Sequence, residues 1–323
     1  MSFSGNAIGL TAFLFVCAPC CLLRCPAQEQ AESPASSVSE GADRSLDDAR
    51  GSIAASDYES ARTKLEAYLR GNSTSAEAHY LLGYSLLHLN DAKASLAEYT
   101  RAAQLRIPSA EELRYVAEDY ALLDDYADAE RWMQRSLQMD GRDPDTWYGL
   151  GRIQYTLQKY PLAVESFQKA LTLAPNSVKV EDNLALSYEG LNREEDAVAA
   201  YQRALDWQKD SDHPSEQPML NLAIILIRKG SLEEAERLLK QAVAIAPKDP
   251  RIRDQLGHLY MQQEQFAKAQ IEFEQAVALA PENASFHFLL GRVYRHEGIR
   301  DKADVEFARA AKLKGGRSTA AAP

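Results

Sequence analysis

Histidine, cysteine and paired acidic residues carry most metal binding and catalysis, so their types and spacing show first which chemistry this chain could perform. The sequence contains no HExxH or HxH pattern, no phosphate-binding glycine loop and no Gly-x-Ser-x-Gly nucleophile turn. The segment 210–214, which includes His213, comes nearest to a metal cluster, but a solvated polar loop explains it better. The six histidines are scattered, at positions 79, 88, 213, 258, 287 and 296. We therefore expect no enzyme activity, no metal ion and no cofactor.

The four cysteines all lie within the first 25 residues, beside an uncharged segment. This segment, residues 7–23, is 17 residues long and falls short of the about 20 that a membrane-spanning helix needs. Cys25 and Ala27 place small residues where a signal peptidase reads the chain. We therefore expect a signal peptide at 1–27 and a protein exported to the periplasm or secreted. Retention of the segment as a membrane anchor is the alternative.

The composition is that of a folded, acidic protein. Of the 323 residues 46% are hydrophobic, which excludes wholesale disorder, and the net charge is −11. Such acidity argues against nucleic acid or an anionic membrane surface as the main partner, because like charges repel. Residues 28–41 are rich in Ser, Glu and Ala and cannot bury an apolar face, so we expect a flexible spacer there.

A period of 34 residues runs through the rest of the chain in three columns, interrupted by a four-residue insert at 212–215. The first column is small: Ala61, Ser95, Ala129, Ala163, Ala197, Ala235, Ala269 and Ala303. The second, four residues on, is large: Tyr99, Met133, Phe167, Tyr201, Leu239, Phe273 and Phe307. The third, three residues further, is small again: Ala102, Ser136, Ala170, Ala204, Ala242, Ala276 and Ala310. One period kept in three columns indicates internal repeats.

Each repeat has the pattern of two helices. In the fourth repeat, Trp147, Leu150, Gly151 and Gln154 lie at i, i+3, i+4 and i+7, which is one face of a first helix. A polar turn follows, and the three columns then mark one face of a second helix that a proline often ends. Glycine in the first helix and alanine in the second let two backbones approach closely. A larger side chain there would cost about 1–3 kcal/mol.

These residues resemble the tetratricopeptide repeat (TPR) family, whose signature is W-x2-L-G-x2-Y…A-x3-F…A…P. The fourth repeat matches it with Trp147, Leu150, Gly151, Ala163, Phe167, Ala170 and Pro175. The resemblance implies an all-α fold, a right-handed α-solenoid of helix-turn-helix units that are stabilised by stacking on their neighbours. We assign eight units, at 42–75, 76–109, 110–143, 144–177, 178–211, 216–249, 250–283 and 284–317, followed by a tail at 318–323. The insert at 212–215 could bend the array into five plus three units.

The same resemblance implies that the first helices line a concave groove that binds extended or helical peptides. Positions 2, 5, 9, 12 and 13 of each unit lie opposite the buried stripe, so we expect them to face this groove. The candidate groove residues are Tyr80, Tyr84, Arg114, Tyr148, Arg152, Tyr155, Leu220, Ile224, Ile227, His258, Phe288, Arg292 and Arg295.

Three groups among these candidates stand out. Those of the fourth and eighth units combine aromatic side chains with Arg, a composition enriched in interface hot spots. The three apolar residues of the sixth unit form a strip that either faces the groove as a contact patch or packs against the neighbouring second helix.

We therefore expect a non-catalytic scaffold that binds a peptide or protein segment in its groove. One alternative is a structural array that self-associates end to end, and another is an accessory factor in envelope polysaccharide or envelope-complex assembly. A TPR subtype that clamps a C-terminal carboxylate is disfavoured, since only Asn183 matches its expected Lys, Asn and Arg residues. The sequence does not identify the partner.

Overall fold

The computed structural model describes residues 34–320, with side chains described for 44–315, and over this range the chain forms sixteen helices and no strand. The expected all-α solenoid is confirmed. The helices form eight consecutive antiparallel pairs, and from the second pair onward the first helix begins at or beside the first residue of each assigned unit. The pairs are α1 (Pro34–Ala54) with α2 (Tyr58–Leu69), α3 (Ala76–His88) with α4 (Ala92–Leu105), α5 (Ala110–Leu122) with α6 (Tyr126–Met139), α7 (Pro144–Thr156) with α8 (Tyr160–Leu173), α9 (Val178–Gly190) with α10 (Glu194–Trp207), α11 (Gln217–Lys229) with α12 (Leu232–Ile245), α13 (Pro250–Gln262) with α14 (Phe266–Leu279), and α15 (Ala284–His296) with α16 (Arg300–Ala320).

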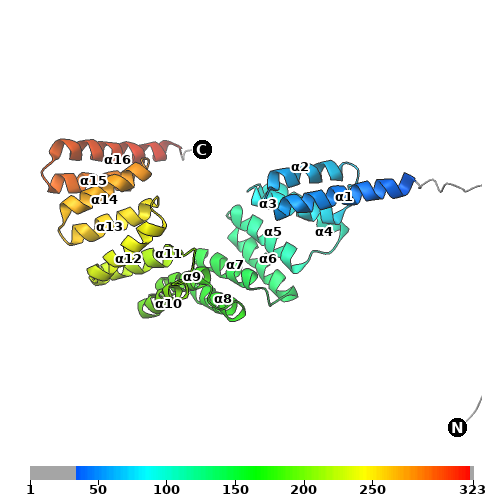
Figure 1. The fold of residues 1–323 in the computed structure, drawn as a ribbon, viewed down its shortest axis with the longest axis horizontal. Coiled ribbons are helices and arrows are strands. Elements are labelled where there is room, and N and C mark those ends of the chain that lie inside the picture. The colour runs from blue at the N-terminus through cyan, green and yellow to red at the C-terminus, as the bar shows by residue number, and fades with distance from the viewer. Residues whose placement is uncertain (1–33, 321–323) are drawn as a thin grey trace, which may run out of the picture.

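The helix pairs follow one another in an open arch (Figure 1). One arm holds α1 to α6 and the other holds α11 to α16, with α7 to α10 between them at the bottom of the view. From α5 to α10 the first helices α5, α7 and α9 lie on the inner side of the arch, and the second helices α6, α8 and α10 lie outside them. This arrangement gives the solenoid a concave inner side.

The three periodic columns form the core of the solenoid. Apart from Phe307, no member of them exposes more than 3% of its surface. Phe307 is half-buried because it lies in the last helix, which no further described repeat covers. The alanines therefore allow close packing, and the large second column fills the space between neighbouring helices.

The glycines of the first helices make room for an aromatic ring rather than for a backbone. A Cβ atom added to Gly151 would lie 2.6 Å from the Phe167 ring, and one added to Gly257 would lie 2.6 Å from the Phe273 ring. The expected close approach of two backbones is therefore corrected: the ring of the second helix packs directly against the glycine of the first.

The turn between the two helices of a unit always contains a left-handed residue at the fifteenth position. Most of these residues are Asn, Asp or Gly, which tolerate positive φ, as at Asn90 (φ 59°) and Gly230 (φ 79°). Many first and second helices then begin with a side-chain cap. Ser109 and Glu112, for example, form a reciprocal capping box at the start of α5.

Two boundaries at the ends of the chain differ from expectation. Helix α1 begins at Pro34, so the last eight residues of the expected spacer are helical. Proline is tolerated in a first helical turn, where its missing N–H has no partner to lose. Helix α16 continues through Gly315 and Gly316 to Ala320, into the expected tail, because glycine ends a helix only where it adopts the left-handed conformation.

The remaining N-terminal expectations, the signal peptide at 1–27 and the first part of the spacer, lie outside the described residues. Within the described part of the chain, no helix is both long and apolar enough to cross a membrane.

The insert at 212–215 lies in the long connection between α10 and α11. The Gln208 side chain holds this connection with two hydrogen bonds, donating to the Ser215 carbonyl (2.8 Å) and accepting from the Ser215 amide (2.9 Å). One apolar cluster extends past the insert without interruption, from Ala163 in α8 to Ala303 in α16. The insert therefore lengthens a loop without dividing the core.

Candidate functional site

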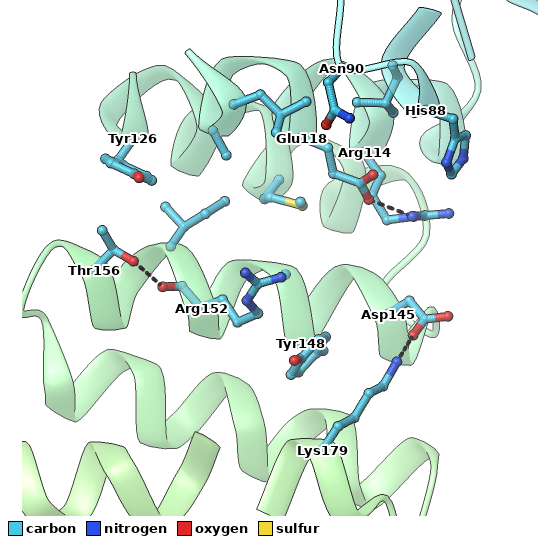
Figure 2. A pocket seen from close by; sticks show the side chains of 16 residues that line it. His88, Asn90, Arg114, Glu118, Tyr126, Asp145, Tyr148, Arg152, Thr156 and Lys179 are labelled. Atoms are coloured by element: carbon cyan, nitrogen blue, oxygen red, sulfur yellow. Dashed lines mark hydrogen bonds and ion pairs between the residues drawn. The ribbon is translucent and has the colours of Figure 1, made fainter. Parts of the chain in front are cut away.

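A cleft of about 550 Å³ lies between the first helices of the third and fourth units, α5 and α7 (Figure 2). Side chains from both helices project into it, and residues of α3, α6 and α9 complete its walls. Most of its lining residues occupy the positions expected to face the groove. They are Leu87, His88, Asn90, Arg114, Glu118, Ala121, Leu122, Tyr126, Met133, Asp145, Tyr148, Gly149, Arg152, Ile153, Thr156 and Lys179.

Tyr148 and Arg152 form the side of the cleft contributed by α7. The Tyr148 ring packs on the buried Phe167 ring, with 6.0 Å between ring centroids, so its position is fixed by the core. The Arg152 guanidinium lies 5.8 Å from the Tyr148 ring centroid. No described carboxylate lies within 4.0 Å of the Arg152 guanidinium, which is exposed and extends into the cleft (Figure 2). This side of the cleft therefore offers the aromatic face of Tyr148 beside the Arg152 guanidinium, which has no carboxylate partner among the described residues.

On the side of the cleft contributed by α5, the charge of Arg114 is already neutralised by neighbouring carboxylates. The Arg114 guanidinium lies 2.7 Å from the Glu118 carboxylate and 3.5 Å from those of Glu111 and Asp143. Burial lowers the pKa of Arg114, but the Glu118 and Asp143 carboxylates raise it by more, so the net shift is upward. Arg114 therefore serves mainly to hold the acidic residues of α5 in place.

Lys179 of α9 closes the third side of the cleft. Its ammonium group lies 3.2 Å from the Asp145 carboxylate and 4.9 Å from the centre of the Tyr148 ring. Both charged partners are more than half exposed, so the ion pair contributes little to stability and can exchange for contacts with a ligand.

The floor of the cleft is apolar, and the missing side chain of Gly149 leaves space for part of this floor. Met133 and Ile153 are core residues that also line the cleft. A Cβ atom on Gly149 would lie 2.7 Å from the Met133 methyl group, so any larger residue would displace this side chain. The arrangement combines apolar surface, an aromatic face and a free cation, which is suited to binding rather than to catalysis.

The structure brings three of the candidate groove residues together in this cleft: Arg114, Tyr148 and Arg152. Tyr84 lies nearby in an aromatic cluster, 4.4 Å from His88 and 4.7 Å from Tyr115 between ring centroids. Tyr155 does not line the cleft and packs against Tyr160 on α8, with 5.5 Å between ring centroids.

Two expectations about accessibility are wrong. Tyr80 is only 5% exposed, because its hydroxyl donates to the Arg106 carbonyl and the Arg106 guanidinium lies 4.3 Å above its ring. Leu220 is 3% exposed and belongs to the main apolar core, against which Ile224 and Ile227 also pack. The strip of the sixth unit is therefore core packing, not a free patch.

The His258 side chain contacts other residues of its own unit. Its Nε2 lies 3.6 Å from the Asp254 carboxylate, and its ring contacts Phe273 edge-on at 5.7 Å. His79 and His287 are structural as well, because each pairs through Nδ1 with a glutamate of the second helix and approaches a backbone carbonyl through Nε2. No group of residues in the described part of the chain is placed to hold a metal ion.

A smaller cavity of about 400 Å³ lies at the C-terminal end of the solenoid, between α15 and α16. Phe288, 43% exposed, packs on Phe307 with 5.6 Å between ring centroids. Arg295 and Lys314 lie over these two rings, at 4.9 Å from Phe307 and 5.7 Å from Phe288. The lining holds both cations and no carboxylate, and consists of Phe288, Arg295, Phe307, Ala310, Ala311 and Lys314.

Sequence reasoning missed Lys179 and Asp145, although both occupy the second position of a unit, where the expected groove pattern could have found them. Met133 and Ile153 carried no such signal, because their sequence positions are typical of core residues; Met133 reaches the cleft beside Gly149.

Comparison with known proteins identifies the family to which these repeats belong. Models described as tetratricopeptide repeat match residues 46–110, 144–177, 177–248 and 255–322, which together cover most of the chain. The chain therefore belongs to the TPR family, whose members generally act as protein-interaction scaffolds.

Curated relatives match part of the chain, and two of them illustrate the extent. The cell division cycle protein 27 homolog B of Arabidopsis thaliana is 27% identical over 129 residues, which are 40% of this chain and 17% of that protein. The peroxisomal targeting signal receptor of Kluyveromyces lactis is 28% identical over 116 residues, 36% of this chain and 20% of that receptor. The chain thus spans about a fifth of the length of these relatives.

Solved structures agree with the fold. Yeast Tom70 is 20% identical with a TM-score of 0.60, over 88% of this chain and 61% of that one. A tetratricopeptide repeat protein from Parabacteroides merdae is 16% identical with a TM-score of 0.62, over 79% and 99%. At these identities the likeness concerns the fold alone.

Proposed function

We propose that this protein is a non-catalytic scaffold that binds a segment of another protein on its inner side, with the cleft between α5 and α7 as the main contact. The observation that carries this proposal is the combination in one concave site of an aromatic face, an unneutralised arginine and an apolar floor. Aromatic residues and Arg are the side chains that dominate binding energy in protein interfaces.

Membership of the TPR family supports the proposal, as does the similarity to a protein named as a receptor for a peroxisomal targeting signal. The cleft has the volume of a pocket that takes one or a few side chains rather than a whole domain. An extended or helical segment could place such side chains in the cleft while the rest of it follows the inner side of the arch.

The Tyr148→Ala, Arg152→Ala double variant is expected to lose peptide binding without unfolding. Random peptides displayed on phage would be selected on the immobilised full chain, and the affinity of the selected peptides would be measured against both proteins. We expect binding to the double variant to be about 2 kcal/mol weaker, roughly 30-fold, because both side chains are truncated at the centre of the contact. Circular dichroism would show that helix content is retained.

A double variant of Arg131→Ala and Arg135→Ala on the outer helix α6 is the matched control. Arg135 also lies over an aromatic ring, 5.7 Å from the centroid of Trp132, so it reproduces the geometry of Arg152 outside the cleft. Selected peptides should bind this control as they bind the unchanged protein. Equal loss in both variants, or no loss in the cleft variant, would reject the site.

A further inference from the structure

The acidic and basic side chains of the inner side differ in whether they have partners. From the second to the eighth unit, seven carboxylates occupy the groove positions, and each has an ion-pair or hydrogen-bond partner. The pairs are Glu77 with Arg50, Glu111 with Tyr115, Glu118 with Arg114, Asp145 with Lys179, Asp182 with Asn221, Glu189 with Tyr201, and Asp254 with Gln255.

Three arginines at the same positions have no such partner. No carboxylate of the described residues lies within 4.0 Å of the guanidinium of Arg152, Arg292 or Arg295. All three side chains are exposed. These three arginines are therefore the cations of the inner side that remain open to an added carboxylate, although the net charge of the whole chain is −11.

These arginines occur in two equivalent arrangements, one in the fourth unit and one in the eighth. In each, an aromatic residue at the fifth position packs on the phenylalanine of the second helix, Tyr148 on Phe167 at 6.0 Å and Phe288 on Phe307 at 5.6 Å. An unpaired arginine follows four residues later in both. The two arrangements lie on α7, at the bottom of the arch, and on α15, in the C-terminal arm (Figure 1).

The charge around the second arrangement strengthens the pattern. The last unit, 284–317, contains eight Lys and Arg against four Asp and Glu, and the groove positions of α15 contain no acidic residue. The third unit, 110–143, is the opposite, with ten acidic and four basic residues. Because the groove positions of α15 hold basic residues and no acidic one, this end of the inner side attracts an acidic partner.

We propose that the segment bound on the inner side is an acidic protein segment, whose carboxylates pair with Arg152 in the middle of the arch and with Arg292 and Arg295 in the C-terminal arm. This inference rests on the proposed function and adds the chemistry of the occupant. Guanidinium groups bind carboxylates in a bidentate geometry, and the adjacent Tyr148 and Phe288 rings offer contacts to apolar side chains between the acidic ones. The apolar component favours a protein segment over a polysaccharide.

The same phage selection separates this inference from the proposed function. Random peptides would be selected on the full chain, on the Arg152→Gln, Arg292→Gln, Arg295→Gln triple variant, and on Arg135→Gln as the control. We expect peptides selected on the unchanged chain and on the control to be enriched in Asp and Glu. Their affinity should fall about tenfold or more in the triple variant and should weaken with added salt.

Each outcome decides one of the two proposals. Selected peptides that are neutral or basic, or acidic peptides that bind the triple variant equally well, would overturn the acidic-segment inference and leave peptide binding intact. Failure to select any peptide would reject peptide binding itself, and the inference with it. Binding of heparin to the three arginines without selection of acidic peptides would replace the inference with an anionic polysaccharide.

Discussion

Replacement of Phe167 by alanine is expected to lower the free energy of unfolding by about 3–5 kcal/mol, the usual cost of removing a buried aromatic side chain. The Phe167 ring is 0% exposed, packs against Gly151 in α7 and supports Tyr148 at the cleft. Because repeat arrays can unfold in parts, hydrogen exchange in α7 and α8 should be measured along with urea denaturation. Protection should fall first in these two helices.

A double-mutant cycle with Gly151→Ala tests the reason for this packing. Alone, Gly151→Ala should cost about 1–3 kcal/mol, since its Cβ would lie 2.6 Å from the ring. In the Phe167→Ala protein the clash is gone, so the same change should become neutral or stabilising by up to about 1 kcal/mol. Gly51→Ala in α1, where a Cβ meets nothing within 4 Å, is the control and should stabilise. Additive effects of the two changes would contradict the direct contact.

Asp119→Asn is expected to stabilise the protein at pH 8 and to leave its stability nearly unchanged at pH 4. Asp119 lies on α5, is 0% exposed and contacts Ser95 of α4, and burial raises the pKa of its carboxyl to about 7. Its Oδ2 lies 2.6 Å from the Ser95 hydroxyl, which itself lies 2.8 Å from the Gly83 carbonyl. A hydroxyl has one proton to donate, so a protonated Asp119 that donates to Ser95 satisfies both contacts.

The direction of the pH effect follows from the raised pKa. Between pH 4 and 7 the folded state holds a proton on Asp119 that the unfolded state has lost, so the stability of the unchanged protein falls as pH rises. At about 1.4 kcal/mol per pKa unit, the accumulated advantage of Asn at pH 8 is on the order of 4 kcal/mol. Urea denaturation across this range measures it, with the exposed Glu165→Gln as control. Parallel curves for Asp119→Asn and the unchanged protein would contradict a buried, protonated carboxyl.

Most of the fold could be predicted from the sequence because the 34-residue period is kept by residues whose size the core restricts. The columns of Ala129, Met133 and Ser136, and their equivalents in other units, are buried as the pattern requires. The glycine positions were also predictable, but their partners were not. Helical periodicity gives the face on which Gly151 lies, and does not show that the Phe167 ring, rather than a backbone, approaches it.

The site could be predicted only in part. Helical spacing gives the direction of a side chain from its own helix, which was sufficient for Arg114, Tyr148 and Arg152. It does not give how closely the next unit packs over that position. For this reason the sequence-based prediction wrongly placed Tyr80 and Leu220 on the groove. Tyr80 is covered by the chain around Arg106, and Leu220 is enclosed by the core.

Site-specific photo-crosslinking tests most directly the central claim that the cleft between α5 and α7 binds another protein. Thr156 is suited to the probe, because it is exposed in the cleft and its hydroxyl bonds only to the Arg152 carbonyl within α7. Benzoylphenylalanine would replace Thr156 in one protein and Arg131, on the outer helix α6, in another. Crosslinks to another polypeptide from position 156, but not from position 131, are the expected result. Equal crosslinking at both positions, or crosslinking from position 131 alone, would contradict the claim.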